Sequence, residues 1–201
     1  MPKKFSESEK EYITRRLKEE AMKCLTAYGV KKTTVDELVK RVNIPKGTFY
    51  LFYESKELLL FDVINDLHES IENKLIQDLT VIKQELTPEL LTNLLFSLYK
   101  EVQKSGLLSI MMGDDLELLM RKLPEKIVKE HLAHDNFNME QFFSLLPFKK
   151  DKNIEAFSGA MRGVFMTLLY KREIGEEVFD EALRIMLRGI IIQMMEEENH
   201  D

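Results

Sequence analysis

Four side chains within one short segment have the chemistry to bind an anion. Lys46 and Lys56 are cations, and Thr48 and Tyr50 carry hydroxyl groups that donate hydrogen bonds. Lys56 is expected in the first turn of a helix that begins at Ser55, where a cation opposes the helix dipole. Its presence there suggests that something anionic, such as a phosphate group, approaches that helix end.

Two short helices joined by a tight turn are predicted to position these residues. Residues 33–58 read TTVDELVKRVNIPKGTFYLFYESKEL. The major groove of B-DNA admits one α-helix, and the first helix of such a pair can brace the second against the backbone. The second helix is expected to start at Pro45. The first has one apolar face, made by Val35, Leu38, Val39 and Val42.

Local signals mark the ends of these helices. Thr34 is a suitable N-cap, and Glu37, three residues later, predicts a capping box. Asn43 tolerates the left-handed conformation that a turn between helices needs. Pro45 suits the first turn of a helix, where its missing N–H has no cost.

The chain resembles the N-terminal domain of the TetR family of transcriptional regulators at three motifs: TTV at 33–35, KGTFY at 46–50 and FYESKEL at 52–58. The likeness covers residues 8–62 and is specific because many fixed offsets agree at once. It implies an all-α fold with two domains. A three-helix DNA-binding domain with a helix-turn-helix would occupy residues 1–56, and a larger helical domain for ligand binding and dimerisation would occupy residues 57–201.

The chain departs from the family pattern around the recognition helix. Asn43 stands where the family usually has Gly, and Pro45 stands where it usually has Ser or Ala. Leu51 replaces a frequent His or Tyr, and Phe52-Tyr53 reverses the usual Tyr-Phe. These changes remove a hydroxyl group at the helix start and a polar tip at Phe52. The fold is expected to survive them, whereas some phosphate contacts are not.

The resemblance implies DNA contacts by the recognition helix and by the helix ends around it. Gly47 lets the backbone approach closely, Lys46 and Thr48 reach base edges or phosphates, and Tyr50 donates to a phosphate. Phe49 is expected in the core. We predict that Lys46→Ala or Tyr50→Ala abolishes operator binding with folding intact. The predicted DNA-binding set is Thr34, Lys46, Gly47, Thr48, Tyr50 and Lys56.

Charge is unevenly distributed along the 201 residues. Residues 1–56 contain 13 Lys and Arg against 8 Asp and Glu, a net charge of +5, whereas the remainder contains 16 against 27, a net charge of −11. An acidic chain is not a general polyanion binder, but a basic N-terminal part fits a protein that touches nucleic acid with one end. Asymmetry of this size also arises by chance, so it supports the motif without replacing it.

Helical periodicity dominates the rest of the chain, and strand alternation is almost absent. A helix from Ser55 to Glu85 would enter the second domain without a flexible linker, which makes it the expected mechanical coupling. The other expected helices are 6–28, stopped by Gly29, then 88–104, 107–122, broken at Gly113, and 124–134, 139–146, 153–172 and 176–197.

Cellular location is indicated by what the chain lacks. The single cysteine, Cys24, excludes an intrachain disulfide, and it shares a helical face with Ile13, Leu17 and Tyr28, so a buried apolar role is expected over a redox role. No apolar run approaches the ~18 residues of a membrane span, and no signal peptide opens the chain. We therefore expect a cytoplasmic protein that does not contact a membrane.

The last helix, 176–197, is apolar almost all round near its end, so more than one of its faces must be buried. A central core helix would explain this, but similar TetR-family proteins form a four-helix bundle from their last two helices in a homodimer. Gly159, Gly163 and Gly189 would allow close helix approach. The predicted dimer interface is Phe157, Val164, Phe179, Leu183, Met186, Ile190 and Met194.

Residues 90–170 are rich in Met and Phe, which suit a cavity for a bulky apolar ligand. Ordinary core would explain any one of them, and the resemblance favours a cavity for the group. Tyr99, Tyr170 or Arg162 could supply a polar contact. The ligand would act by shifting the spacing of two reading heads. The predicted ligand-binding set is Phe96, Tyr99, Met111, Met120, Phe143, Met161 and Phe165.

Other polar clusters have plainer explanations. His131 and His134 have a spacing that could hold a metal, but their polar surroundings favour a solvated face. Asp114 and Asp115 are expected at a helix N-terminus. We find no catalytic constellation, nucleotide loop or metal signature, and we expect no enzyme activity and no cofactor.

Two functions compete on the sequence. The first is a repressor that binds a palindromic operator as a homodimer and is released by a small, largely apolar ligand. The alternative is a helical protein-interaction module with degenerate DNA binding. The departures at Pro45, Leu51 and Phe52 keep the alternative open.

Overall fold

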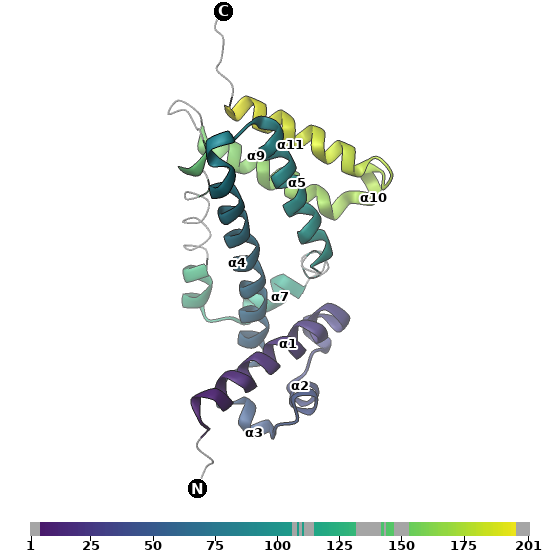
Figure 1. Cartoon of the computed structure of the whole chain (residues 1–201). Coiled ribbons are helices and arrows are strands. Elements are labelled where there is room, and N and C mark those ends of the chain that lie inside the picture. Colours follow the sequence, from purple (N-terminus) through teal and green to yellow (C-terminus); the bar gives the residue numbers. More distant parts are fainter. Residues whose placement is uncertain are drawn as a thin grey trace, which may run out of the picture. The chain divides into compact units, whose positions relative to one another are not determined.

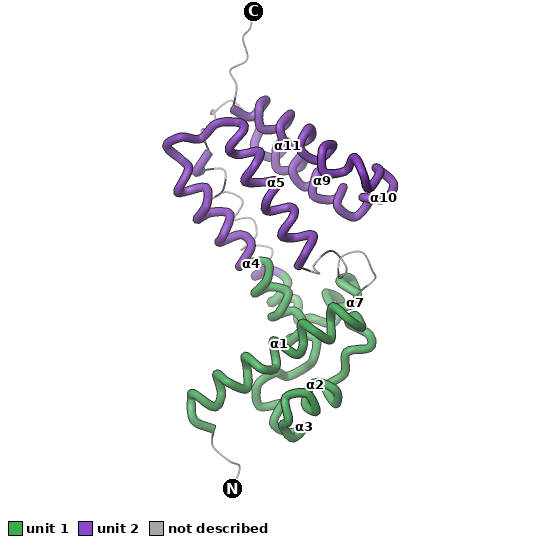
Figure 2. The backbone as a smooth tube through the Cα atoms, turned by 45° about the vertical axis from the view of Figure 1, so that its right-hand side comes forward, with its two compact units in different colours: residues 1–69, 109–128 green, residues 70–108, 129–201 purple. Residues whose placement is uncertain are grey.

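The chain folds into two helical units. The structure is a computed structural model that describes residues 5–105, 108, 110, 115–131, 142, 144–146 and 153–195. Every regular element in these ranges is a helix, which confirms the predicted all-α fold (Figure 1). Unit 1 comprises residues 1–69 and 109–128, and unit 2 comprises residues 70–108 and 129–201 (Figure 2). None of the helices in the described ranges is long and apolar enough to cross a bilayer.

Unit 1 begins with α1, Glu7–Lys32. A capping box starts it: the Glu9 N–H donates to Ser6 Oγ (3.2 Å), and the Ser6 N–H donates to Glu9 Oε2 (2.8 Å). The predicted end at Tyr28 is partly wrong, because α1 resumes after a break at Gly29. Gly29 has φ +73°, which residues with a Cβ rarely adopt. Thr33 closes the helix, since its N–H and its hydroxyl both donate to the Gly29 carbonyl (3.2 and 2.7 Å).

Three further helices and the start of a long one complete unit 1. These are α2, Val35–Val42, α3, Lys46–Phe49, and α7, Asp115–Lys122; α4, Lys56–Ile82, contributes its first turns. Cys24 is buried as predicted, and burial raises the pKa of its thiol. The fully buried large side chains of unit 1 include Leu17, Leu25, Leu38, Phe49, Leu59, Leu60 and Leu119.

Unit 2 is built around the contact of α5, Pro88–Lys104, and α9, Ile154–Thr167, with α11, Phe179–Met195. Thr87 caps α5 as its sequence predicts, since its Oγ1 accepts from the Leu90 N–H (3.2 Å). The single helix predicted for 153–172 is instead α9 followed by η2, Leu168–Tyr170, and α10, Lys171–Ile174. The 3₁₀ turn η1, Lys83–Glu85, follows α4. One face of α11 is buried through Phe179, Leu183, Leu187, Ile191 and Met194.

The start of α11 also differs from its prediction, Glu176. Gly175 has φ +111°, and residues 176–178 form a turn before the helix begins at Phe179. Gly113, the turn expected at 135–138 and half of the helix expected at 139–146 lie outside the described residues.

Candidate nucleic-acid interface

The start of α2 and the turn that follows it have part of the geometry that the sequence predicts. Thr34 Oγ1 accepts from the Glu37 N–H (3.2 Å), and Asn43 adopts the left-handed conformation at φ 59°. Pro45 lies directly before α3 instead of in its first turn. The second half of the predicted capping box is wrong, because the Glu37 carboxylate accepts from Arg41 Nε (2.6 Å). An ion pair has thus replaced a backbone cap.

The short helix α3 has one buried side chain, Phe49, and an otherwise largely exposed surface. Phe49 is fully buried, as expected, and its ring meets that of Tyr50 edge to face at 5.3 Å between centroids. Tyr50 is 51% exposed. Lys46 and Gly47 are exposed too, and nothing lies within 4 Å of the position that a Cβ on Gly47 would take. Thr48 is half-buried, so α3 presents mainly Lys46, Gly47 and Tyr50 to a ligand.

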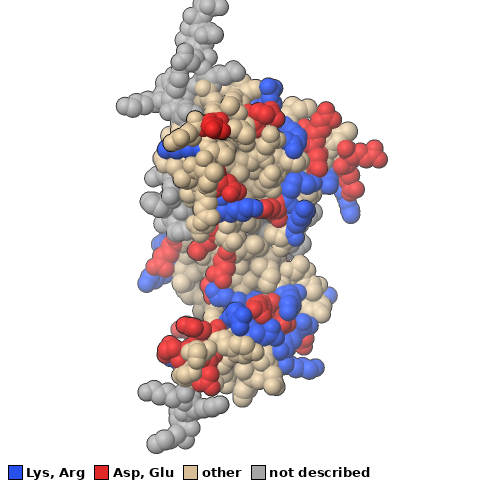
Figure 3. Space-filling model, viewed as in Figure 1, with Lys and Arg blue, Asp and Glu red and all other residues tan. Residues whose placement is uncertain are grey.

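Positive charge around the helix pair is largely compensated by neighbouring acids. Figure 3 shows Lys and Arg side chains over α1 and α2 interleaved with Asp and Glu. The pairing reaches the recognition helix, since Lys46 Nζ lies 2.8 Å from Asp36 Oδ1 in the first turn of α2. Asp36 accepts a hydrogen bond from Lys46 and raises the pKa of its ammonium group. A phosphate that binds Lys46 must therefore compete with Asp36.

Lys56 is used inside unit 1. Its ammonium group donates to the carbonyl oxygens of Val30 (2.7 Å) and Thr33 (2.6 Å), which lie at the C-terminal end of α1. Burial lowers the pKa of Lys56. The cation therefore satisfies carbonyl groups at a helix end, where positive charge is favourable. This role was missed by the sequence prediction, which assigned Lys56 to a phosphate; two of its three N–H donors are already occupied.

The reversed pair Phe52-Tyr53 also turns its polar group inward. The Tyr53 hydroxyl donates to Asp62 Oδ2 (2.7 Å), and Lys18 Nζ lies 2.9 Å from the same oxygen. Burial is the main cause that raises the pKa of Tyr53. Phe52 instead packs near Phe5, with 6.1 Å between ring centroids. The family's usual order would place this hydroxyl group at residue 52. Here it lies at residue 53 and binds Asp62 of α4.

A groove of 960 Å³ opens beside this pair, between one face of α1, the turn after α3, and α4. Its apolar lining includes Phe5, Leu51 and Phe52. Its rim carries both signs of charge, among them Lys18 and Asp66, which pair at 2.8 Å. A uniformly anionic phosphate backbone does not match a rim of mixed charge.

The start of α7 is tied to the break in α1. Asp115 Oδ2 accepts from the Val30 N–H at 2.9 Å, directly after Gly29. Lys122, at the other end of α7, pairs with Glu57 at 2.9 Å. Asp115 is an acid in the first turn of a helix, as predicted, while Asp114 lies outside the described residues. No local pattern in the sequence indicates either tie.

These features have a family counterpart. Residues 17–63 match the family model described as bacterial regulatory proteins of the tetR family. The N-terminal part of the chain is therefore similar to that family. YhgD, an uncharacterized HTH-type transcriptional regulator of Bacillus subtilis (strain 168), is 38% identical over 56 residues, which are 28% of this chain and 29% of that relative. The match thus spans less than a third of the length of that relative.

Solved TetR-family structures share the fold over nearly the whole chain. A proposed TetR-family transcriptional regulator from Mesorhizobium loti MAFF303099 has a TM-score of 0.64 at 14% identity, covering 92% of this chain and 96% of that one. Thermus thermophilus FadR, a TetR-family transcriptional repressor in complex with lauroyl-CoA, has a TM-score of 0.57 at 21% identity, covering 94% and 98%. At these identities the likeness is one of fold.

The predicted ligand-binding residues fall into separate places. Tyr99 is buried, donates to the Met161 carbonyl (3.1 Å) and meets the Phe165 ring at 6.0 Å between centroids. Phe96 lies under the Arg184 guanidinium of α11, 3.7 Å from its ring centroid. Met120 belongs to α7 of unit 1. Met111 and Phe143 lie outside the described residues.

The predicted dimer residues face largely inward. Those in the core of unit 2 are Val164, Phe179, Leu183 and Met194, and those that are half-buried are Phe157, Met186 and Ile190. Their burial arises because α11 turns one face towards α5 and α9. Other apolar residues of the same helices are exposed, including Met166 and Ile185, which is 65% exposed. A second chain can therefore reach the half-buried and the exposed residues, but not those in the core of unit 2.

Proposed function

We propose that this protein is a TetR-family transcriptional repressor that binds a palindromic operator as a homodimer and is released by a small, largely apolar ligand. The observation that best supports this proposal is the exposed edge of α3. Lys46, Gly47 and Tyr50 project from a helix whose Phe49 is fully buried, directly after a left-handed turn at Asn43. Such an edge offers a cation, a hydroxyl group and a bare backbone to a major groove.

Dimerisation is proposed through the exposed sides of α9 and α11. Gly159, Gly163 and Gly189 have nothing within 4 Å of the position that a Cβ would take, which leaves room for close helix approach. Met166 and Ile185 add exposed apolar area there. A two-fold dimer would allow two α3 helices to enter successive major grooves about 34–36 Å apart.

The proposed ligand is apolar because unit 2 has aromatic and Met side chains to meet one. The ring of Tyr99 on α5 meets the ring of Phe165 on α9, and the Tyr99 hydroxyl donates to the Met161 backbone carbonyl. The T. thermophilus FadR structure, which shares this fold, contains lauroyl-CoA, whose acyl chain is of the same chemical class. A ligand of this kind releases DNA if it binds better to the conformation that binds DNA less well.

The test is binding of the purified protein to the DNA upstream of its own gene, compared with scrambled DNA, over a range of salt concentrations. Tight, selective binding with a steep salt dependence is the expected result. Weak binding without sequence preference, there and across a genomic library, would favour the interaction module. One observation favours that alternative: Lys56 and Tyr53 bind groups within unit 1 and are not free for DNA.

The sequence alone predicts that Lys46→Ala abolishes operator binding. Because Lys46 already pairs with Asp36, we expect a smaller loss of affinity of about 10–100-fold, the scale of one base or phosphate contact. The salt slope should also fall by about 0.9 if the lost contact is to a phosphate. Tyr50→Ala should weaken binding similarly. Lys83→Ala is the matched control, because it removes the same charge from the exposed turn η1 in unit 2. Fluorescence anisotropy measures the affinity of the folded variants for operator DNA. Wild-type affinity in both the Lys46 and Tyr50 variants would show that α3 is not part of the interface.

Asp36→Asn is expected to raise affinity for DNA about threefold at low salt, because it frees Lys46 from an exposed ion pair and removes an anion near the phosphates. The gain should shrink as salt screens both effects. Asp36→Glu keeps the charge and serves as control. Equal affinities of Asp36→Asn and wild type at every salt concentration would show that Lys46 is not held back by Asp36.

A further inference from the structure

Glu20 is the only charged residue among the described parts of the chain that is buried, at 6% exposure. It lies on α1, which packs against α2. A carboxylate in such a place is unfavourable unless cations pair with it, and an apolar residue would fill the same space without that requirement. Its low exposure therefore depends on the cations that cover it, whose own side chains are 30% to 61% exposed.

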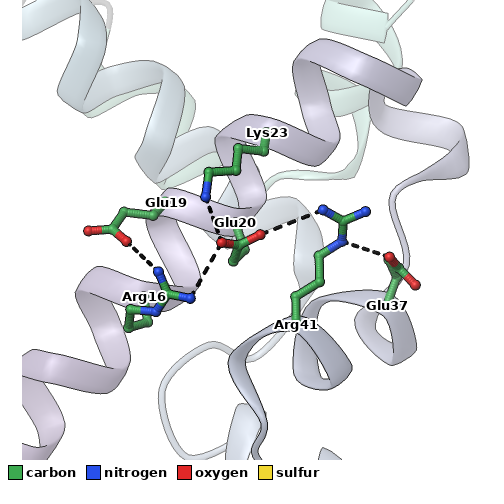
Figure 4. A network of polar contacts seen from close by, with 6 residues as sticks. All are labelled: Arg16, Glu19, Glu20, Lys23, Glu37 and Arg41. Carbon is green, nitrogen blue, oxygen red and sulfur yellow. Dashed lines mark hydrogen bonds and ion pairs between the residues drawn. The ribbon is translucent and has the colours of Figure 1, made fainter.

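Three cations surround this carboxylate (Figure 4). Lys23 Nζ lies 2.8 Å and Arg16 Nη2 lies 3.5 Å from Glu20 Oε1, and both belong to α1. Arg41 Nη1 lies 3.6 Å from the other oxygen, Oε2, and belongs to α2. Lys23 contributes most to lowering the pKa of Glu20. One oxygen thus binds within α1, and the other ties α1 to α2.

Arg41 is held from a second side as well. Its Nε donates to Glu37 Oε1 at 2.6 Å, and its guanidinium carbon lies 6.0 Å from the centroid of the Tyr28 ring. Arg41 lies in the last turn of α2, two residues before Asn43 turns the chain towards α3. Whatever orients Arg41 therefore orients the start of the recognition helix.

We propose that Glu20 is a positioning residue for the recognition helix: through Arg41 it fixes α2 on α1 in the orientation at which α3 presents Lys46 and Tyr50. This rests on the proposed DNA-binding function. An ion pair suits the role because its geometry is directional, whereas apolar contacts tolerate sliding. Arg suits it better than Lys because a planar fork can engage two carboxylates at once.

The decisive comparison is Glu20→Gln against Glu19→Gln. Both variants remove one negative charge from neighbouring residues of α1 and preserve side-chain shape. Within the described part of the chain, however, Glu19 pairs with Arg16 of its own helix and not with α2. Glu20→Gln should lower operator affinity about tenfold, the scale of one misaligned base contact, without weakening binding to scrambled DNA. Glu19→Gln should change neither by more than about twofold. Equal effects of the two variants on operator selectivity would overturn the proposal.

Arg41 supplies the second arm. Arg41→Gln should reproduce the loss of selectivity. The double variant with Glu20→Gln should be no worse than Arg41→Gln alone, because the Glu20–Arg41 ion pair is already lost in that variant. Additive losses would overturn the proposal. Arg41→Lys keeps the charge and should restore binding only in part.

Hydrogen exchange of the free protein gives a readout that needs no DNA. Glu20→Gln should speed exchange in residues 35–50 more than in residues 7–28, and Glu19→Gln should not. If the wild type binds operator and scrambled DNA equally, the proposed DNA-binding function is wrong. The exchange data would still show whether Glu20 orders α2 and α3. Unchanged exchange in residues 35–50 would overturn the positioning role.

Discussion

Phe49→Ala is expected to lower the free energy of unfolding by about 3–5 kcal/mol, the range for large aromatic side chains deleted from a core. Phe49 is fully buried, and its ring packs nearly perpendicular to the Tyr50 ring and lies 6.2 Å from the Tyr53 ring between centroids. Its backbone carbonyl, which the substitution retains, accepts from the N–H groups of Phe52 and Tyr53 (2.9 and 3.0 Å), so the expected loss comes from the ring. DNA binding should be lost because the recognition helix has no other large anchor in the core.

Urea denaturation followed by circular dichroism measures this effect. Leu51→Ala is the matched control, since Leu51 lies two residues away and is 68% exposed. It should change stability by less than about 0.5 kcal/mol. Similar losses in both variants would mean that α3 is not anchored through Phe49.

Gly29→Ala is expected to destabilise the protein by about 2–4 kcal/mol, because two penalties act together. Gly29 has φ +73° with ψ −179°, a region that is nearly confined to glycine. An added Cβ would also lie 2.1 Å from Asp115 Oδ2, the oxygen that accepts from the Val30 N–H. Relief of the clash would therefore break the tie between α1 and α7.

Thermal and urea unfolding of three variants separates these penalties. Gly47→Ala is the control, because its Cβ would meet nothing within 4 Å; it should leave stability unchanged or raise it by up to about 1 kcal/mol. In an Asp115→Ala background, Gly29→Ala should be less damaging, since only the backbone strain remains. A Gly29→Ala variant as stable as wild type would contradict the backbone conformation at this residue.

The local part of the candidate interface could be predicted from sequence. The N-cap at Thr34 and the left-handed turn at Asn43 depend on residues only a few positions away. The burial of Phe49 follows from its place between polar neighbours on a short helix. The second half of the capping box failed even at this range, because Arg41 offered Glu37 a charged partner in place of a backbone N–H.

The partners of the polar side chains could not be predicted in this way. Lys56 reaches a carbonyl 26 positions earlier, and Asp115 reaches an N–H group 85 positions earlier. Nothing in the spacing of these residues records which donor meets which acceptor. The Glu20–Arg41 ion pair belongs to the same class, because it joins side chains of two different helices, α1 and α2.

The helices of unit 2 show a similar division. Apolar periodicity predicted that α11 has more than one buried face, but it could not say that Leu183 faces its own chain while Ile185 faces outward. The sequence by itself determined the helices, their caps and the turn that presents α3, because these depend on interactions within a few residues. Only the tertiary structure decided which cations, hydroxyl groups and apolar faces remain available to a partner, because those partners come from distant segments and are chosen by packing.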